Sequence, residues 1–305
     1  MNNFSIVIPV FRATDTLEKI LKDCIVQYPE NLKQVVFVFD GGDENSWKKI
    51  ENLSKRYSIV KGIKLSKNYG QHNATICGFN YIKTEFVITM DEDYQHDPKV
   101  ISELFNEQNK NDFDLVYADF LNREHNLFRN LTSTLLKKLL KYGIPNLNEN
   151  YSSFRLIKSS VAKKTIEYNN SYSFLDGYLT WLTSNTSSIK IRHLESQAGK
   201  SSYSFRKLVN HSLNIFLTFS NLPIRVVSFF AILFFIISFS YAIIIVINAI
   251  YNNNYAVGFP TLISIICFGI GTILLCLAIL GEFIARINMK TTNKPNYNIE
   301  KEIND

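Results

Sequence analysis

Residues 86–98 read FVITMDEDYQHDP, an apolar run that ends in a cluster of acidic and amide side chains. The run Phe86–Thr89 is typical of a buried strand, and Asp91, Glu92 and Asp93 follow it closely. Three neighbouring carboxylates repel one another, and burying any of them without compensation costs free energy. The pattern fits either a solvated turn or a site for a cation that needs oxygen ligands, so the rest of the chain has to decide between them.

Short apolar runs alternate with helical patterns over the first 120 residues. Strands are expected at FSIVIPVF (4–11), QVVFVFD (34–40), VKGIKLS (60–66), EFVITMDED (85–93) and FDLVYADF (113–120). This alternation predicts an α/β domain with a mostly parallel sheet covered on both faces. Ligands bind at the carboxyl ends of the strands in such sheets. Asp40 and the acidic residues after Thr89 both stand at those ends, so we expect a site there.

A long uncharged stretch occupies the C-terminal part of the chain. Residues 226–281 are 56 residues without Asp, Glu, Lys, Arg or His, interrupted near the middle by Asn252–Asn254. A helix of about 25 residues is roughly 37 Å long. That length crosses a hydrocarbon core of about 30 Å with some tilt. The sequence therefore predicts two transmembrane helices.

The charges that flank the two predicted spans set their orientation. Arg225 precedes the first span, and Arg286, Lys290 and Lys294 follow the second, whereas the connecting loop carries no charge. The positive-inside rule places both flanks in the cytoplasm. We find no signal peptide before the first strand, so residues 1–220 are expected to be cytoplasmic as well. The predicted location is the cell (inner, cytoplasmic) membrane, with two spans and a cytoplasmic C-terminus.

The net charge, the cysteines and two amphipathic stretches give further information on the class of protein. The net charge of +6 suits a protein that lies against an anionic leaflet, and no nucleic-acid-binding motif accompanies it. The four cysteines form neither a disulfide framework nor a zinc pattern. Residues 126–143 are amphipathic and basic, which fits either an ordinary helix packed on the sheet or an interfacial helix. Residues 203–219 have the same character and run towards the first span. The polar tail after Arg286 has no hydrophobic period and is expected to be disordered.

Six stretches, in order along the chain, carry a resemblance to a known family. They are VIPVF, VFDGGDENSW, LSKNYGQHNAT, MDEDYQHDP, SSFRLIK and GKSSYSFRKL, the last continuing towards two spans. Together they resemble the family 2 glycosyltransferases, in the branch that glycosylates polyprenyl phosphates. The resemblance covers nearly the whole chain. It implies a Rossmann-like GT-A fold, a nucleotide-sugar donor and a divalent cation, Mg²⁺ or Mn²⁺.

This resemblance also predicts a division of the chain. We expect a cytoplasmic GT-A domain over residues 1–202 and an interfacial amphipathic helix over residues 203–221. A transmembrane hairpin is then expected over residues 222–286, followed by a polar cytoplasmic tail over residues 287–305.

The acidic segment matches the family motif for the metal and the diphosphate. By resemblance, Asp91, Asp93 and Gln95 are the metal ligands, and Asp93 is a catalytic residue. Residues at alternate positions project to one side of an extended segment. Glu92 should then point away from the metal as a solvated side chain, and His96 should belong to the turn or the helix cap.

The donor site is assigned on the same grounds. By resemblance, the nucleotide-sugar is bound by residues from the first strand, the second strand end, the LSKNYG segment and the acidic segment: Pro9, Val10, Phe11, Asp40, Lys67, Asn68 and Asp91. The motif histidine, His72, is expected to be a hydrogen-bonding loop residue rather than a base.

The acceptor phosphate is assigned to basic and hydroxyl side chains. By resemblance, Arg155 is a catalytic residue that binds the acceptor phosphate, together with Lys200, Ser201 and Tyr203. An arginine suits planar, bidentate phosphate recognition. The chain departs from the family at Ser196, where many relatives have an arginine.

The absence of a motif bears on the mechanism. A hydroxyl acceptor needs a carboxylate base, but a phosphate monoester with a second pKa of about 6 is already mostly dianionic at neutral pH. We find no E-D pair near residues 170–200. Asp119, Glu124 and Asp176 are the carboxylates best placed to act as a base if this interpretation is wrong.

The sequence therefore predicts a membrane-bound inverting glycosyltransferase. It would move a sugar from a UDP- or GDP-sugar to a polyprenyl phosphate, undecaprenyl phosphate in bacteria, for the synthesis or modification of cell-surface glycans. The alternatives are a glycosyltransferase with a sugar or lipid hydroxyl as acceptor, and a non-catalytic membrane scaffold that retains the fold. The expected partners are the donor, the acceptor lipid and the bilayer, without nucleic acid. The sequence is also compatible with a homo-oligomer.

Overall fold

The structure is a computed structural model. It describes residues 1–12, 16–121, 148, 150–168, 173–192, 258–291 and 295–304, together with isolated residues between 229 and 251. The chain divides into two compact units. The first consists of residues 1–216 and 293–305, and the second of residues 217–292.

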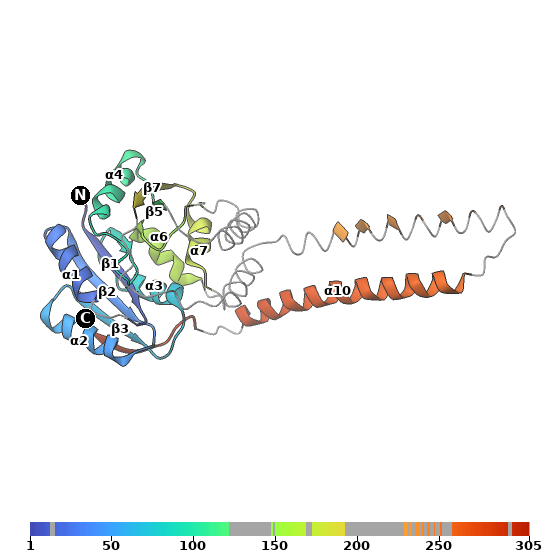
Figure 1. Ribbon diagram of the computed structural model, residues 1–305, viewed down its shortest axis with the longest axis horizontal. Helices are drawn as coiled ribbons and strands as arrows, with labels where there is room; N and C mark the ends of the chain where they lie inside the picture. Colours follow the sequence, from blue (N-terminus) through green and yellow to red (C-terminus); the bar gives the residue numbers. More distant parts are fainter. Residues whose placement is uncertain are drawn as a thin grey trace. The chain divides into compact units, whose positions relative to one another are not determined.

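An eight-stranded sheet forms the centre of the first unit (Figure 1). The order of its strands is β7-β5-β6-β4-β1-β2-β3-β8. The strands are β1 (Phe4–Val10), β2 (Leu32–Phe39), β3 (Val60–Leu65), β4 (Phe86–Thr89), β5 (Leu115–Leu121), β6 (Arg155–Lys158), β7 (Thr186–Arg192) and β8 (Ile299–Ile303). Four neighbouring pairs are parallel, β1 with β2, β1 with β4, β2 with β3 and β5 with β7. The predicted α/β fold with a mostly parallel sheet is confirmed.

Helices cover both faces of this sheet. They are α1 (Thr16–Gln27), α2 (Glu44–Arg56), α3 (Gln71–Phe79), α4 (Val100–Asn111), α6 (Ser159–Lys164), α7 (Leu175–Leu182) and the 3-10 helix η1 (Thr165–Glu167). Side chains alternate between the faces of a strand. Ile6 and Ile8 of β1 accordingly share one buried cluster with α1, α2 and α4. Val7 points to the opposite face, where α3 packs so closely that a Cβ on Gly78 would lie 2.4 Å from Val7 Cγ1.

The order of the strands creates a topological switch point. The chain runs from β1 to β2 and β3 on one side of β1, and then returns to β4 on the other side. The crevice outside the carboxyl ends of two such strands is the usual ligand position in open α/β sheets. Phe11 follows β1 and Asp91 follows β4, so the acidic segment stands at this switch point.

Residues 295–304 of the C-terminal tail are ordered, where the sequence predicted disorder. Residues 299–303 form β8, which pairs antiparallel with β3. Lys301 pairs with Glu51 of α2 at 2.7 Å, and Asn304 Nδ2 donates to Ser54 O at 2.7 Å. The expectation failed because β8 is an edge strand whose side chains are mostly exposed. Backbone hydrogen bonds and ion pairs hold it, and neither leaves an apolar period in the sequence.

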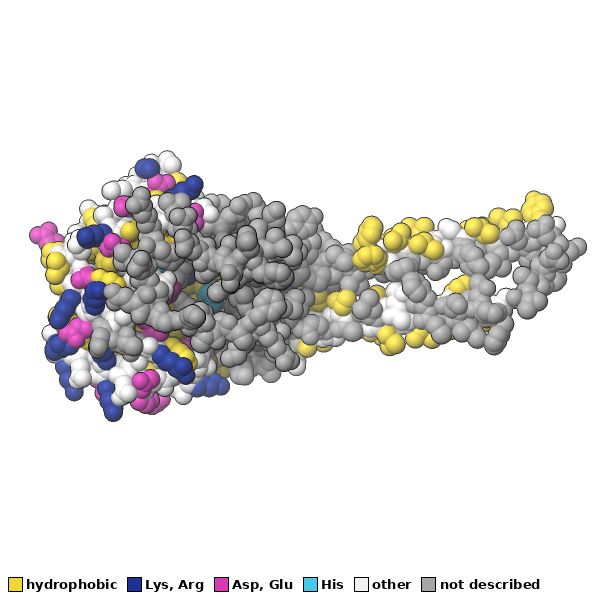
Figure 2. All heavy atoms as spheres, in the orientation of Figure 1, with side chains coloured by type: hydrophobic (Ala, Val, Ile, Leu, Met, Phe, Trp, Pro, Cys, Tyr) yellow, Lys and Arg dark blue, Asp and Glu magenta, His cyan; other side chains and the backbone are white. Residues whose placement is uncertain are grey.

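The second unit contains helix α10 (Phe259–Thr291), which has 33 residues. Several of its large apolar side chains are exposed, including Leu262, Leu274 and Ile284. Figure 2 shows hydrophobic side chains at the surface of the second unit. Among the residues that the structure describes, no helix meets the combined length and apolarity required to cross a membrane. Most of the first expected span and the amphipathic stretches 126–143 and 203–221 lie outside the described residues.

Deleting residues 298–305 should destabilise the first unit, because β3 would become an open edge. The ammonium of Lys61, which is buried, would also lose its contacts with Glu302 at 3.4 Å and with Asn304 O at 3.2 Å. Removing one partner of a buried charge costs about 3–5 kcal/mol. We expect a lower melting temperature and faster hydrogen exchange in β3.

The matched control is Lys301→Ala, which removes an ion pair with an exposed lysine, worth about 0–1 kcal/mol. Equal stability of the truncated protein and this control would show that β8 contributes little to the sheet.

Candidate active site

A cavity of about 380 Å³ opens at the switch point between β1 and β4. Residues from the ends of β1, β2 and β4, from the loop before α3 and from the start of α3 line it: Pro9, Val10, Phe11, Asp40, Asn68, Gly70, Gln71, Asp91, Glu92 and Asp93. A larger hollow of about 800 Å³ lies at the amino ends of the same strands and includes none of the predicted site residues. The smaller cavity is therefore the candidate active site.

The structure brings most of the predicted donor and metal residues together. Pro9, Val10, Phe11, Asp40, Asn68, Asp91 and Asp93 all line this cavity. Lys67, Gln95 and Arg155 do not. The ammonium of Lys67 lies 5.2 Å from the centre of the Tyr69 ring. Lys200, Ser201 and Tyr203 lie outside the described residues, so their assignment to the acceptor phosphate stays a prediction.

Asp91 is held by neutral donors from two other segments. Gln71 Nε2 donates to Asp91 Oδ1, and Ser153 Oγ donates to Asp91 Oδ2 at 2.6 Å. Gln71 begins α3, and Ser153 comes just before β6. Neither donor was singled out from the sequence, although both stand inside the quoted motifs. They fix the direction of the carboxylate without neutralising its charge.

His96 packs against the acidic segment and accepts a hydrogen bond from it. The backbone N–H of Asp91 donates to His96 Nδ1 at 3.1 Å, and the imidazole stacks on Phe154 with ring centres 4.8 Å apart. Burial lowers the pKa of His96, even though Asp91 and Asp93 raise it. Because Nδ1 accepts a hydrogen bond, the neutral ring carries its proton on Nε2, which lies 3.8 Å from Asp91 Oδ2. The histidine shapes the turn, as the sequence led us to expect.

Asp93 completes the acidic face of the cavity. Its Oδ1 accepts a hydrogen bond from the backbone N–H of Gln95 at 3.1 Å. Burial raises the pKa of Asp93, and the neighbouring charge of Asp91 raises it further. Tyr94, which follows, has a φ of 61° and donates its hydroxyl hydrogen bond to Asp23. This left-handed residue turns the chain sharply after Asp93.

The carboxylate oxygens of the acidic segment suit a hard divalent cation that also binds a substrate. The described residues contain no group of three or more His, Cys, Asp or Glu side chains arranged to hold a metal ion. Mg²⁺ commonly binds through one or two carboxylates and completes its shell with water and phosphate oxygens. Asp91 and Asp93 in the cavity wall match that pattern.

Glu92 is not the solvated side chain that the sequence predicted. Its carboxylate accepts the backbone N–H of Phe11 at 3.0 Å and that of Arg12 at 3.2 Å. Burial raises the pKa of Glu92, although these two hydrogen bonds lower it. The expectation was wrong because the partners are backbone amides about 80 residues away, which have no sequence signature.

Asp40 is a second carboxylate whose oxygens both accept backbone N–H groups. Its Oδ1 accepts from Tyr69 and its Oδ2 from Gly70, each at 2.7 Å. Burial raises the pKa of Asp40 to about 6, while these two hydrogen bonds lower it. Asp40 therefore fastens the loop before α3 to the end of β2, and its predicted contact with the nucleotide stays a prediction.

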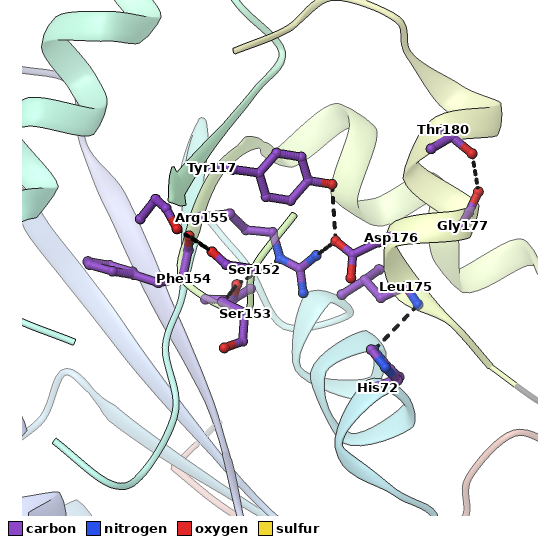
Figure 3. A network of polar contacts seen from close by, with 12 residues as sticks. His72, Tyr117, Ser152, Ser153, Phe154, Arg155, Leu175, Asp176, Gly177 and Thr180 are labelled. Atoms are coloured by element: carbon purple, nitrogen blue, oxygen red, sulfur yellow. Dashed lines mark hydrogen bonds and ion pairs between the residues drawn. The ribbon is translucent and has the colours of Figure 1, made fainter. Parts of the chain in front are cut away.

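A buried ion pair joins Arg155 and Asp176 (Figure 3). The guanidinium of Arg155 donates through Nη1 to Asp176 Oδ1, and through Nε to Thr89 Oγ1 at 3.1 Å. Tyr117 OH donates to the same Asp176 oxygen at 3.0 Å. Arg155 and Asp176 are each only 3% exposed. Burial raises the pKa of Asp176, whereas the Arg155 charge lowers it. Arg155 thus joins β6 to α7, and its predicted contact with the acceptor is untested.

Comparison with known proteins identifies the family of this chain. The sequence profile of Glycosyl transferase family 2 matches residues 5–166, which is more than half of the chain. The chain belongs to glycosyl transferase family 2. The chain is therefore a glycosyltransferase, and the first unit has the Rossmann-like GT-A fold.

The relatives of this glycosyltransferase agree with the predicted branch. An undecaprenyl-phosphate 4-deoxy-4-formamido-L-arabinose transferase of Edwardsiella ictaluri is 28% identical, over 98% of this chain and 94% of its own. A prophage-derived bactoprenol glucosyl transferase of Shigella flexneri is also 28% identical, over 97% of each chain.

Solved structures share the fold at lower identity. One is the glucosyl-3-phosphoglycerate synthase of Mycobacterium tuberculosis in complex with Mn²⁺, UDP-glucose and phosphoglyceric acid. It superimposes with a TM-score of 0.53 at 13% identity and covers 72% of this chain and 78% of that chain. At this identity the likeness shows the fold alone.

Asp176→Asn should destabilise the first unit by about 3–5 kcal/mol, because it leaves the buried Arg155 guanidinium without its counter-charge. The double variant Arg155→Met/Asp176→Asn should recover part of this loss. Chemical denaturation followed by tryptophan fluorescence measures both effects. A variant Asp176→Asn that keeps wild-type stability and substrate binding but loses turnover would instead make Asp176 the general base.

Proposed function

We propose that this glycosyltransferase moves a sugar, with inversion, from a UDP- or GDP-sugar to a polyprenyl phosphate. Undecaprenyl phosphate is the proposed acceptor, and cell-surface glycans are the proposed destination. The observation that carries the proposal is the 28% identity, over nearly the whole chain, to transferases named for undecaprenyl phosphate and bactoprenol. The acidic cavity at the switch point supports a diphosphate-bearing donor.

The donor diphosphate would meet the acidic segment. Asp91 and Asp93 would hold Mg²⁺ or Mn²⁺, which when bound acts as a Lewis acid and neutralises the departing diphosphate. Gln71 and Ser153 keep the Asp91 carboxylate oriented before any ligand arrives. Gln95 is not part of the cavity lining, so its role as a third ligand is the weaker part of the metal assignment.

The contacts of the cavity carboxylates indicate whether the nucleophile could have a general base. Four carboxylates line it, and two of them, Asp40 and Glu92, each accept two backbone N–H groups. The other two, Asp91 and Asp93, are committed to the cation in this proposal. Among the described residues that line the cavity, no carboxylate is then left to act as a base. A phosphate acceptor needs none, because its second pKa is about 6. Its oxygen attacks the anomeric carbon while the bond to the nucleoside diphosphate breaks.

We also propose that residues 222–286 anchor the enzyme in the cell membrane as a two-helix hairpin, with the catalytic unit and the tail in the cytoplasm. The uncharged run 226–281 and its basic flanks support this topology. The exposed apolar side chains of α10, such as Leu274, would face lipid or a neighbouring helix. A lipid acceptor also requires the active site to work at a bilayer surface.

Asp93→Asn should lower sugar transfer by about a hundredfold or more, because metal stabilisation of the leaving diphosphate is worth several kcal/mol. The assay follows labelled UDP- and GDP-sugars into lipid extracts with undecaprenyl phosphate as acceptor. Asp97→Asn is the control, because the Asp97 side chain accepts the Lys99 N–H and does not line the cavity at the switch point.

Wild-type activity of Asp93→Asn at saturating metal would exclude the ligand role. Transfer to the unphosphorylated polyprenol, but not to its phosphate, would replace the proposed acceptor with a hydroxyl.

A cysteine introduced at Asn253, in a cysteine-free background, should react with a membrane-impermeant maleimide added to intact cells. The predicted loop between the two spans carries this residue to the outside. A cysteine at exposed Lys301 of β8 should react only after the cells are permeabilised. The reverse labelling pattern would overturn the topology.

A further inference from the structure

Glu92 connects the acidic segment to the loop that follows β1. One carboxylate oxygen accepts the Phe11 N–H at 3.0 Å, and the other accepts the Arg12 N–H at 3.2 Å. The backbone carbonyl of Glu92 also accepts a hydrogen bond from Thr16 Oγ1 at 2.6 Å. Three hydrogen bonds thus join residue 92 to Phe11, Arg12 and Thr16, which are distant from it in sequence.

The Phe11 peptide is held from its other side as well. The Asp43 N–H lies 3.4 Å from the Phe11 carbonyl oxygen and donates to it. Gly42, with a φ of 103°, allows this approach, since a Cβ there would lie 2.0 Å from that oxygen. The Phe11 backbone is therefore fixed between the turn after β2 and the acidic segment after β4.

Phe11 is placed to contact a ligand. Its side chain is 37% exposed, although it follows a fully buried strand, and it lines the cavity together with Asp91 and Asp93. The Arg12 guanidinium lies 5.2 Å from the centre of the Phe11 ring. A flat, partly exposed aromatic ring suits stacking against a nucleoside base.

The negative charge of Glu92 is unfavourable beside two other carboxylates, so a compensating interaction is expected. Glu92 stands between Asp91 and Asp93, so its charge adds repulsion to a segment that is already half-buried. Hydrogen bonds from backbone N–H groups to an ionised carboxylate are shorter and about twice as strong as neutral ones. The hydrogen bonds from the Phe11 and Arg12 N–H groups favour the ionised form of Glu92 and so act against this repulsion.

We propose that Glu92 is a positioning residue for the donor nucleoside. It fixes Phe11 and Arg12 relative to Asp91 and Asp93, so that the wall for the nucleoside and the carboxylates for the diphosphate are aligned before the donor binds. The proposal rests on the nucleotide-sugar donor of the proposed function, and it adds a role that is separate from metal ligation.

The first test measures the affinity of UDP and GDP by calorimetry, on the full-length enzyme in detergent, in EDTA and again with Mn²⁺. For the nucleotide that binds the wild type, Glu92→Ala should weaken binding about tenfold under both conditions. Glu92→Gln, which keeps one acceptor oxygen, should recover most of the affinity. A loss confined to the Mn²⁺ measurement would make Glu92 a metal ligand and overturn the positioning role.

Thr16→Val is the matched control. It removes the hydrogen bond to the Glu92 carbonyl but leaves both carboxylate contacts intact. Nucleotide affinity of Thr16→Val should stay close to that of the wild type, even if its melting temperature falls as far as that of Glu92→Ala. An equal loss of affinity in both variants would mean that Glu92 acts only through the stability of the loop.

Kinetics separate this inference from the proposed function. Glu92→Ala should raise KM for the donor about tenfold, while kcat changes by less than about threefold. A wild-type enzyme that binds nucleotide but transfers nothing to undecaprenyl phosphate would refute the acceptor assignment and leave the affinity test valid. A normal enzyme whose Glu92→Ala variant has unchanged donor affinity would refute only the role of Glu92.

Discussion

Desolvated negative charge at the switch point is the constraint on which the rest of the site depends. Four carboxylates share a cavity of about 380 Å³, and each needs a partner there because like charges in a partly dry site repel strongly. Asp40 and Glu92 obtain theirs from backbone N–H groups of two different loops. Asp91 receives neutral donors from Gln71 and Ser153. The same contacts that make the charges tolerable therefore assemble the cavity walls.

The hydrogen-bond partners of Asp91 connect the cavity to strand β6 and, through it, to helix α7. Ser153 holds Asp91, and Arg155, two residues later, is bound to Asp176 on α7. Arg155 lies opposite Thr89 in the antiparallel pairing of β6 with β4, so the strand that carries the acidic segment is tied to the strand that carries the arginine. A change at the buried ion pair can thus reach Asp91, the proposed metal ligand, through one short strand.

The sequence predicted the parts of the fold that depend on apolar patterns. β1, β4 and the part of β2 from Val35 to Phe39 are continuous buried runs, and the cavity lies at their carboxyl ends. The hydrogen-bond partners of Glu92 and Asp40 could not be predicted from the sequence. They are backbone N–H groups, which every residue except proline has and which leave no sequence pattern. The pairing of Arg155 with Asp176 depends on how β6 and α7 meet, which neither segment encodes alone. β8 was missed because an exposed edge strand carries the composition of a polar tail.

The position of β8 in the chain has a consequence for biosynthesis. The body of the first unit ends at Phe216, but its edge strand begins only at Ile299, after the 82 residues 217–298 have been made. At about 5–20 residues per second, the ribosome needs roughly 4 to 16 s for that stretch. During this interval β3 presents unpaired backbone groups, which favour association with other strands. The edge of β3 therefore stays open during synthesis until β8 has been made, so the sheet is completed only after the uncharged segment.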